Sequence, residues 1–151
     1  MSTDIQFRPA TKEDKAFVDA LLFDTMHKFV EDTWQDDEAR NEYYIRNSFR
    51  MEGTEIIQAG GEDIGRISRT RHPDHIFIDE LHVLPKYHRI GAGRQALERV
   101  IAEARTAHLP IRATILKVNC PSQLLCFATG FRVFGFKEHR FQIEYQPDWN
   151  R

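Results

Sequence analysis

Cysteine is scarce in this sequence, because the 151 residues contain only Cys120 and Cys126. Two cysteines in an apolar stretch supply neither the disulfide framework of a small secreted protein nor the paired spacing of a zinc site. We therefore expect the protein in the reducing cytoplasm.

Long apolar runs and an excess of one charge are also missing. No run approaches the roughly 20 apolar residues that a membrane-spanning helix needs, and residues 1–4 contain no basic region like that of a signal peptide. Acidic residues number 23 against 21 lysines and arginines, so we expect no membrane association and no general nucleic-acid binding. Because no repeat or linker interrupts the chain, residues 1–151 are predicted to form a single domain.

The hydrophobic pattern alternates between strand-like and helix-like segments. In chain order we predict strands at residues 5–8, 55–59, 63–68, 76–84, 111–118, 131–134 and 141–145, with helices from near residue 11 and over residues 36–49, 93–108 and 121–129. Gly60-Gly61 predicts a hairpin between the second and third strands. This mixed order is typical of an α/β layer fold.

A glycine-bearing segment at the start of one predicted helix is a candidate phosphate site. It comprises Arg89, Ile90, Gly91, Ala92, Gly93 and Arg94. Glycine lets the backbone approach a ligand closely, and a helix N-terminus presents free N–H groups and the positive end of its dipole. Two arginines add cations suited to phosphate oxygens. The spacing alone is equally consistent with a purely structural turn.

The same glycines also match the dinucleotide-binding fingerprint over residues 91–96, with Ala96 in the last place. In that motif the glycines follow the strand directly, whereas residues 85–90 intervene here. The motif also requires an acidic residue at the end of the next strand, which ends instead in Val118 and Asn119. These two differences argue against a nicotinamide enzyme.

Two motifs carry a family resemblance. Residues 81–93, Leu-His-Val-Leu-Pro-Lys-Tyr-His-Arg-Ile-Gly-Ala-Gly, resemble the central motif of the GNAT superfamily of N-acetyltransferases, in which a strand ends in valine and proline and a glycine-bearing loop begins a helix. Residues 117–133 are similar to the family's asparagine, short helix and Gly-Phe strand start. Residues 7–14 and 25–34 are similar to one bacterial branch of the superfamily.

The resemblance implies a mixed, mostly antiparallel sheet of six or seven strands with about four flanking helices. Its central parallel strands would splay to admit the pantetheine arm of acetyl-CoA. It also implies that the backbone of Leu81, His82 and Val83 binds that arm, that residues 89–94 bind the pyrophosphate, and that Asn119 contacts the cofactor. The implied reaction is direct acetyl transfer to an amine, with no metal.

The sequence departs from the family pattern at two positions. His88 stands where the family usually has Arg or Gln, which leaves Arg89 and Arg94 as the cations of the loop. Cys126 stands where the family commonly has the tyrosine that protonates the departing thiolate. Cys126 is therefore the candidate proton donor.

Glu80 and Asp79 are the candidates for the general base that removes the amine proton. Both lie in an otherwise apolar strand, where burial would raise the carboxyl pKa. In a regular strand they point to opposite faces, so we expect only one to reach the cleft, and we prefer Glu80. The alternative is that both are structural acids.

Glu31 and Trp34 follow the first predicted helix, where members of the family usually place the acceptor pocket. An acid there would attract a cationic amine and an indole would stack on it, although a structural cap and core pair is the alternative. Histidines 72, 75, 82 and 88 lack the accompanying acids and cysteines of a zinc site, so we expect no metal.

The sequence thus predicts an N-acetyltransferase that uses acetyl-CoA as co-substrate on an amine of a small molecule or a protein. The alternative is a CoA-binding sensor or partner-binding domain of the same fold with weakened catalysis. The sequence leaves the acceptor and the oligomeric state open, a homodimer included.

Overall fold

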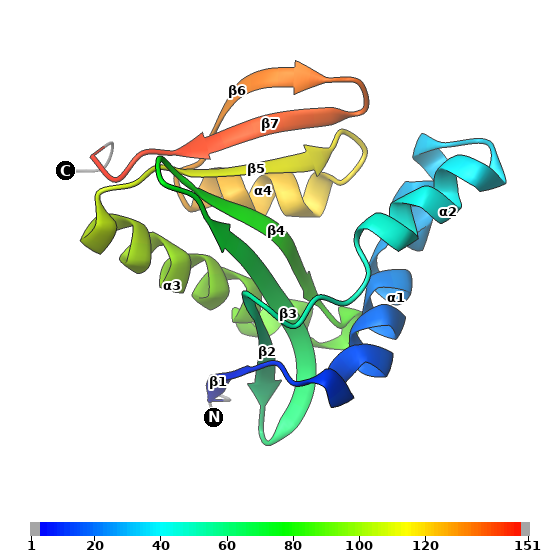
Figure 1. Ribbon diagram of the computed structural model, residues 1–151, viewed down its shortest axis with the longest axis horizontal. Helices are drawn as coiled ribbons and strands as arrows, with labels where there is room; N and C mark the ends of the chain where they lie inside the picture. Colours follow the sequence, from blue (N-terminus) through cyan, green and yellow to red (C-terminus); the bar gives the residue numbers. More distant parts are fainter. Residues whose placement is uncertain (1–3, 149–151) are drawn as a thin grey trace.

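The computed structural model describes residues 4–148, which form one mixed sheet with helices around it (Figure 1). The described strands are β1 (Ile5–Pro9), β2 (Thr54–Ala59), β3 (Glu62–Arg71), β4 (Ile76–Val83), β5 (Ile111–Leu116), β6 (Arg132–Lys137) and β7 (Arg140–Tyr145). The helices are α1 (Lys15–Thr33), α2 (Asp37–Arg46), α3 (Ala92–Ala107) and α4 (Cys120–Ala128), with 3-10 turns η1 (Lys12–Asp14) and η2 (Pro85–Ile90).

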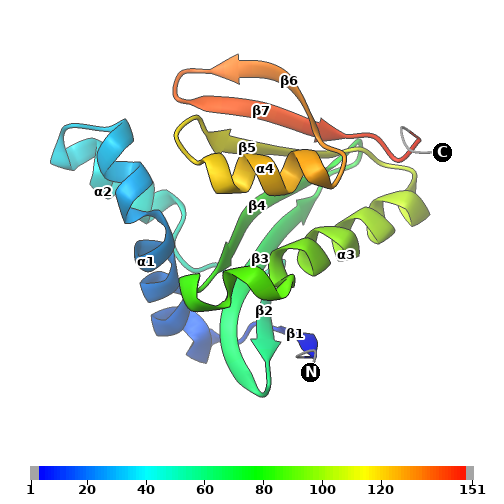
Figure 2. The same cartoon turned by 180° about the vertical axis from the view of Figure 1, so that it is seen from behind.

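The sheet order is β1-β2-β3-β4-β5-β7-β6, and only β4 and β5 pair in parallel. The predicted mixed, mostly antiparallel sheet is therefore confirmed, and this arrangement is not the parallel sheet of a nicotinamide-binding fold. Figure 2 shows α3 and α4 in front of the sheet. Adjacent residues of β2 belong to the cores on opposite faces of the sheet. Ile57 packs in the cluster that includes α3, and Ile56 packs with Val18 of α1.

The central strands separate soon after they meet. β5 pairs with β4 only at Ile76–Ile111 and Phe77–Arg112, and beyond these pairs the two strands diverge (Figure 1). The rest of β4 therefore has β3 on one side and no strand on the other.

Local signals placed several boundaries correctly. Gly60 and Gly61 have φ of 58° and 82° and connect β2 to β3 in the predicted hairpin. In contrast, the helix predicted over residues 36–49 ends at Arg46. Asn47 Nδ2 donates to the Tyr43 carbonyl at 2.7 Å, and the Asn47 carbonyl accepts from Arg66 Nη2 at 2.8 Å. This contact with β3 draws the chain out of the helix.

A β-bulge at Asp79 changes which side chains share a face of β4. Ser68 pairs with Glu80 but Arg69 pairs with Ile78, so Asp79 is the extra residue. The apolar core beside α3 accordingly contains Ile76 and Ile78, then Leu81 and Val83. The bulge places Glu80 on the face opposite that core.

Candidate active site

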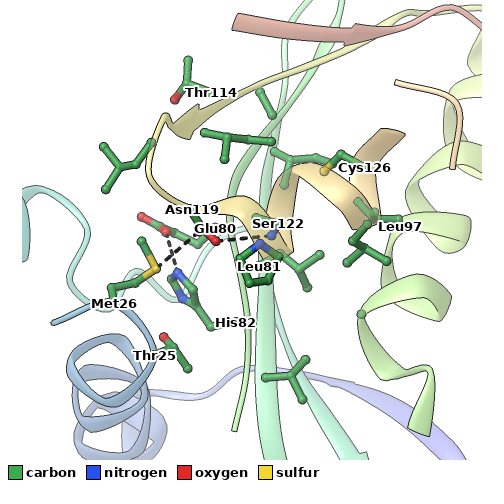
Figure 3. A pocket seen from close by; sticks show the side chains of 18 of the residues that line it. Thr25, Met26, Glu80, Leu81, His82, Leu97, Thr114, Asn119, Ser122 and Cys126 are labelled. Atoms are coloured by element: carbon green, nitrogen blue, oxygen red, sulfur yellow. Dashed lines mark hydrogen bonds and ion pairs between the residues drawn. The ribbon is translucent and has the colours of Figure 1, made fainter. Parts of the chain in front are cut away.

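A cleft of about 390 Å³ opens where β4 and β5 separate (Figure 3). Its lining comes from both faces of the sheet: Thr25, Met26, Phe29, Tyr43 and Asn47 from the α1–α2 side, residues 78–83 of β4, His88, Gly91, Gly93, Arg94 and Leu97 around the start of α3, Ala113, Thr114, Ile115 and Leu116 of β5, Asn119, Pro121, Ser122, Leu125 and Cys126 around α4, and Phe131 and Arg140. The cleft is thus built by the splay of the sheet.

The N-terminus of α3 opens into this cleft. Gly91 has a left-handed φ of 83°, and the helix begins with the bond from the Gln95 N–H to the Gly91 carbonyl at 3.0 Å. The N–H groups of residues 92–94 precede this first bond, so they and the helix dipole would suit an anion. A Cβ on Gly93 would come within 3.0 Å of Leu125 Cδ2. The glycine therefore lets the start of α3 pack closely against Leu125 of α4.

The structure brings only part of the predicted phosphate segment to the cleft. Gly91, Gly93 and Arg94 line it, whereas Ala92 is buried in the core. Arg89 and Ile90 lie in η2, exposed and outside the lining. The anion site is consequently made mainly of backbone amides.

The edge of β4 borders the cleft at Leu81, His82 and Val83, the residues whose backbone the resemblance assigns to the pantetheine arm. The ring of His88 turns back onto this edge, and its Nε2 donates to the Val83 carbonyl at 2.7 Å. His88 therefore fixes the end of β4, where the family usually has Arg or Gln.

Glu80, His82 and Arg66 form a buried polar group beside the cleft. Arg66 Nε donates to His82 Nδ1 at 3.4 Å, and His82 Nε2 lies 3.3 Å from Glu80 Oε2. Arg66 Nη2 is 3.9 Å from the same oxygen. Because Nδ1 accepts a hydrogen bond, the neutral ring carries its proton on Nε2, directed toward Glu80.

Burial shifts the titration of both cleft residues. It raises the pKa of Glu80 to about 8, against the opposing effect of Arg66. It lowers the pKa of His82 to about 3, and Arg66 adds to that effect. His82 is therefore neutral near pH 7, while Glu80 exchanges its proton in the range that suits a general base.

The expectation that only one of Asp79 and Glu80 reaches the cleft is wrong. Both line it, because the bulge removes the regular alternation. They differ in their partners: Asp79 accepts from Arg50 Nη2 and from Thr70 Oγ1, each at 2.8 Å. Asp79 is thereby held in an ion pair, and Glu80 is the more deeply buried acid.

The candidates at the start of α4 and within it, Asn119 and Cys126, both line the cleft. Asn119 caps the helix, accepting from the Ser122 N–H at 3.2 Å, and its Nδ2 lies 4.0 Å from Met26 Sδ. Cys126 is buried, which raises the pKa of its thiol to about 12. The thiol therefore keeps its proton at neutral pH and is a weak acid.

The two acceptor candidates separate in the structure. Glu31 is exposed and outside the cleft lining. Trp34 packs against Tyr43, with ring centroids 5.6 Å apart, and its ring lies 5.6 Å from the Arg140 guanidinium. Trp34 therefore supports the cleft wall from behind rather than lining it.

A second cavity of about 530 Å³ adjoins the cleft on the α2 side of the sheet. It is lined by Arg46, Asn47, Ser48, Arg50, Arg66, Ser68, Phe77, Asp79, Glu80, Thr114, Lys137, Glu138 and Arg140. Both cavities share Asn47, Asp79, Glu80, Thr114 and Arg140. Glu80 thus stands at their junction.

The sequence analysis missed Arg66, Tyr43 and Arg140. Arg66 is 1% exposed, and its position between Ile64 and Ile67, within a strand that also carries exposed charges, is a weak signal of burial. Tyr43 and Arg140 gave no local signal, because only the fold brings them to β4.

Two kinds of feature are not found in the part of the chain that the structure describes. Residues 4–148 contain no group of three or more His, Cys, Asp and Glu side chains placed to hold a metal ion. None of their helices combines the length and apolar character needed to span a bilayer.

A sheet that splits beside a helix N-terminus is the arrangement that the family resemblance implied for the binding of acetyl-CoA. The model of the acetyltransferase (GNAT) family matches residues 18–131, so the chain belongs to this family, whose members use acetyl-CoA. No curated protein sequence matches the chain.

Solved structures share the fold at low sequence identity. The PaiA N-acetyltransferase of Thermoplasma acidophilum in complex with coenzyme A is 15% identical, with a TM-score of 0.77 over 95% of this chain and 99% of that one. The ribosomal-protein-S18-alanine N-acetyltransferase of Escherichia coli is 14% identical, with a TM-score of 0.70 over 95% and 94%. A GNAT acetyltransferase of Bacillus anthracis is 17% identical, with a TM-score of 0.69 over 98% of both chains.

Proposed function

We propose that this protein transfers an acetyl group from acetyl-CoA to the amine of a small molecule or a protein, with Glu80 as general base. The position of Glu80 carries the proposal, since this carboxyl, whose side chain is 10% exposed, borders both the cleft and the second cavity. An acceptor that enters from the second cavity meets the base where the two spaces join.

The residues of the cleft fit the co-substrate. The free amides at the start of α3 suit a pyrophosphate, and the open edge of β4 at Leu81, His82 and Val83 offers backbone groups to an extended amide-bearing arm. Arg94 adds a cation at the mouth, and Asn119 lines the opposite wall. Acetyl-CoA, when bound, supplies the thioester that the amine attacks.

The protein's own contribution is to move and hold protons. An aliphatic amine is protonated near pH 7, and the Glu80 carboxylate accepts one proton from it before attack. A base with a pKa of about 8 is closely matched to this transfer. The Nε2–H of His82 and the guanidinium of Arg66 hold the carboxylate in place.

Cys126 is the remaining candidate for a proton donor to the departing thiolate. Its raised pKa makes the transfer unfavourable, because an ordinary thiol has a pKa of about 8.5. We therefore assign Cys126 a minor role at most and propose that water protonates the thiolate.

Thiol release from acetyl-CoA over a panel of amines and peptides tests the proposal, with mass spectrometry of the acetylated product. Acceptor-dependent release with an N-acetyl product supports an enzyme. Tight acetyl-CoA binding without transfer to any acceptor supports the alternative, a CoA-binding sensor of the same fold.

We propose a location in the cytoplasm, because Cys120 and Cys126 are both free thiols.

A further inference from the structure

We infer that the acceptor is an amine that also carries an anionic group, carboxylate or phosphate, and that Arg140 binds this group. The inference rests on the proposed function and names the substrate class of the same site. The second cavity carries five basic side chains, from Arg46, Arg50, Arg66, Lys137 and Arg140. Its acids are only three, Asp79, Glu80 and Glu138.

Most of the basic side chains in this cavity already have partners. Arg50 pairs with Asp79 at 2.8 Å. Arg66 donates to the Asn47 carbonyl at 2.8 Å and lies 3.9 Å from Glu80. Arg46, at the outer edge, lies 3.6 Å from Glu42. These arginines therefore have partners before any ligand enters.

Arg140 differs from them. Within residues 4–148 its guanidinium makes no ion pair and no side-chain hydrogen bond, and its contact is the ring of Trp34, 5.6 Å away. It is partly buried and lines both cavities. A ring contact leaves the N–H groups at the guanidinium edge free, and these donors match a carboxylate or phosphate in bidentate geometry.

The other unpaired charges lie in the solvent. Lys137 and Glu138, around the β6–β7 turn, are both exposed and largely offset each other. Arg140 follows them on β7, where it pairs with Leu116 of β5 across from β4. An acceptor with its amine at Glu80 would therefore present its other end to Arg140.

The charge of Arg140 is also felt at the base. Arg140 is among the groups that lower the pKa of Glu80, with Arg66 and Arg50, while Asp79 raises it. An anion on Arg140 would cancel this effect and make the Glu80 carboxylate a stronger base. Binding of the anionic acceptor would thus favour proton transfer.

Matched acceptor pairs test the inference: glycine, β-alanine and γ-aminobutyrate against their carboxamides, and O-phosphoethanolamine against ethanolamine. With the wild-type protein we expect kcat/KM to favour the anionic member of at least one pair by tenfold or more. A preference within the amino-acid pairs indicates a carboxylate, and a preference for O-phosphoethanolamine indicates a phosphate. Arg140→Gln should remove most of this preference through the acceptor KM, with KM for acetyl-CoA unchanged. Arg140→Lys should restore part of it.

Lys117→Gln is the matched control, because Lys117 also lies over an aromatic ring, that of Phe136 at 5.5 Å, but outside both cavity linings. It should keep the preference. If the wild type had equal kcat/KM values for the two members of every pair, or if Arg140→Gln lowered kcat/KM equally for both members, the inference would be overturned and the proposed function would stand. If no amine of any kind is acetylated, both fall.

Discussion

His82 Nε2 lies 3.3 Å from Glu80 Oε2, although the two residues come from a strand in which a regular pattern would set Glu80 among the core residues Ile76 and Ile78. Glu80 and His82 share a face by ordinary alternation, and the bulge at Asp79 turns both to the side opposite Ile76 and Ile78. One extra residue therefore decides on which face of the sheet this pair lies.

Replacing this acid tests its role directly. Glu80→Gln should lower kcat/KM at least a hundredfold, the usual size of a general-base effect, with acetyl-CoA affinity within threefold of the wild type. Asp79→Asn is the control, because Asp79 is a neighbouring carboxylate held by Arg50. If Asp79→Asn loses as much as Glu80→Gln, the base is misassigned.

The pH dependence of the rate follows from the raised pKa of Glu80. A base with a pKa of about 8 should make kcat/KM rise about tenfold per pH unit below pH 8 and level off above it. Acceptors whose amines have different pKa values separate the titration of Glu80 from that of the amine, because the limb of the pH profile due to Glu80 keeps its position. A limb that moves with the amine in every case would contradict this assignment.

The free energy of unfolding should fall as pH increases, whereas kcat/KM should rise. The Glu80 pKa rises from 4.5 to about 8 on folding, so the folded state binds the extra proton between these values and loses stability as pH increases through them. Glu80→Gln cannot ionise. Its melting temperature relative to wild type should therefore increase from pH 5 to pH 8, by several degrees. A constant difference would show that Glu80 titrates normally.

A side chain at Gly93 should block the anion site. Gly93→Val should weaken acetyl-CoA binding at least tenfold in calorimetry, about 1.4 kcal/mol, because even a Cβ comes within 3.0 Å of Leu125 and the branched group covers the helix amides. Gly61→Val is the comparison: φ is 82° and nothing lies within 4 Å, so it loses stability without touching the cleft. Unchanged affinity in Gly93→Val would remove the pyrophosphate site.

Cys126 should prove dispensable. Cys126→Ala is expected to keep activity within tenfold, and no acetylated Cys126 should accumulate during turnover, because a thiol with a pKa of about 12 is neither a good acid nor a nucleophile. Brief alkylation at pH 7.5 should modify exposed Cys120 and spare buried Cys126. A thousandfold loss with intact cofactor affinity would instead make this thiol catalytic.

Local patterns predicted the elements and several of the residues that line the cleft. The hairpin at Gly60-Gly61 and the glycine start of α3 depend on backbone preferences of a few residues, which the sequence displays directly. The family resemblance then supplied the splay of β4 and β5, which no local pattern encodes.

The acceptor side depends on contacts between distant segments and was not predictable in the same way. Arg66 and Arg140 come from β3 and β7, and the helix predicted to continue to Phe49 ends because Arg66 takes the Asn47 carbonyl. Glu31, predicted to follow the first helix, lies within the last turns of α1, where it is exposed and outside both linings. Helical periodicity alone did not determine which side of α1 meets the cleft.

The narrow junction of the central strands has a consequence for cohesion. Because β4 and β5 share only Ile76–Ile111 and Phe77–Arg112, the part of the sheet from β1 to β4 and the part from β5 to β7 are joined by a short hydrogen-bonded strip and by the helices. A ligand bound in the gap would contact both parts and stabilise their association. At a hundredfold excess over its Kd, such a ligand adds about 2.7 kcal/mol to the free energy of unfolding. Hydrogen exchange of the backbone amides along the facing edges of β4 and β5 would slow when the ligand binds.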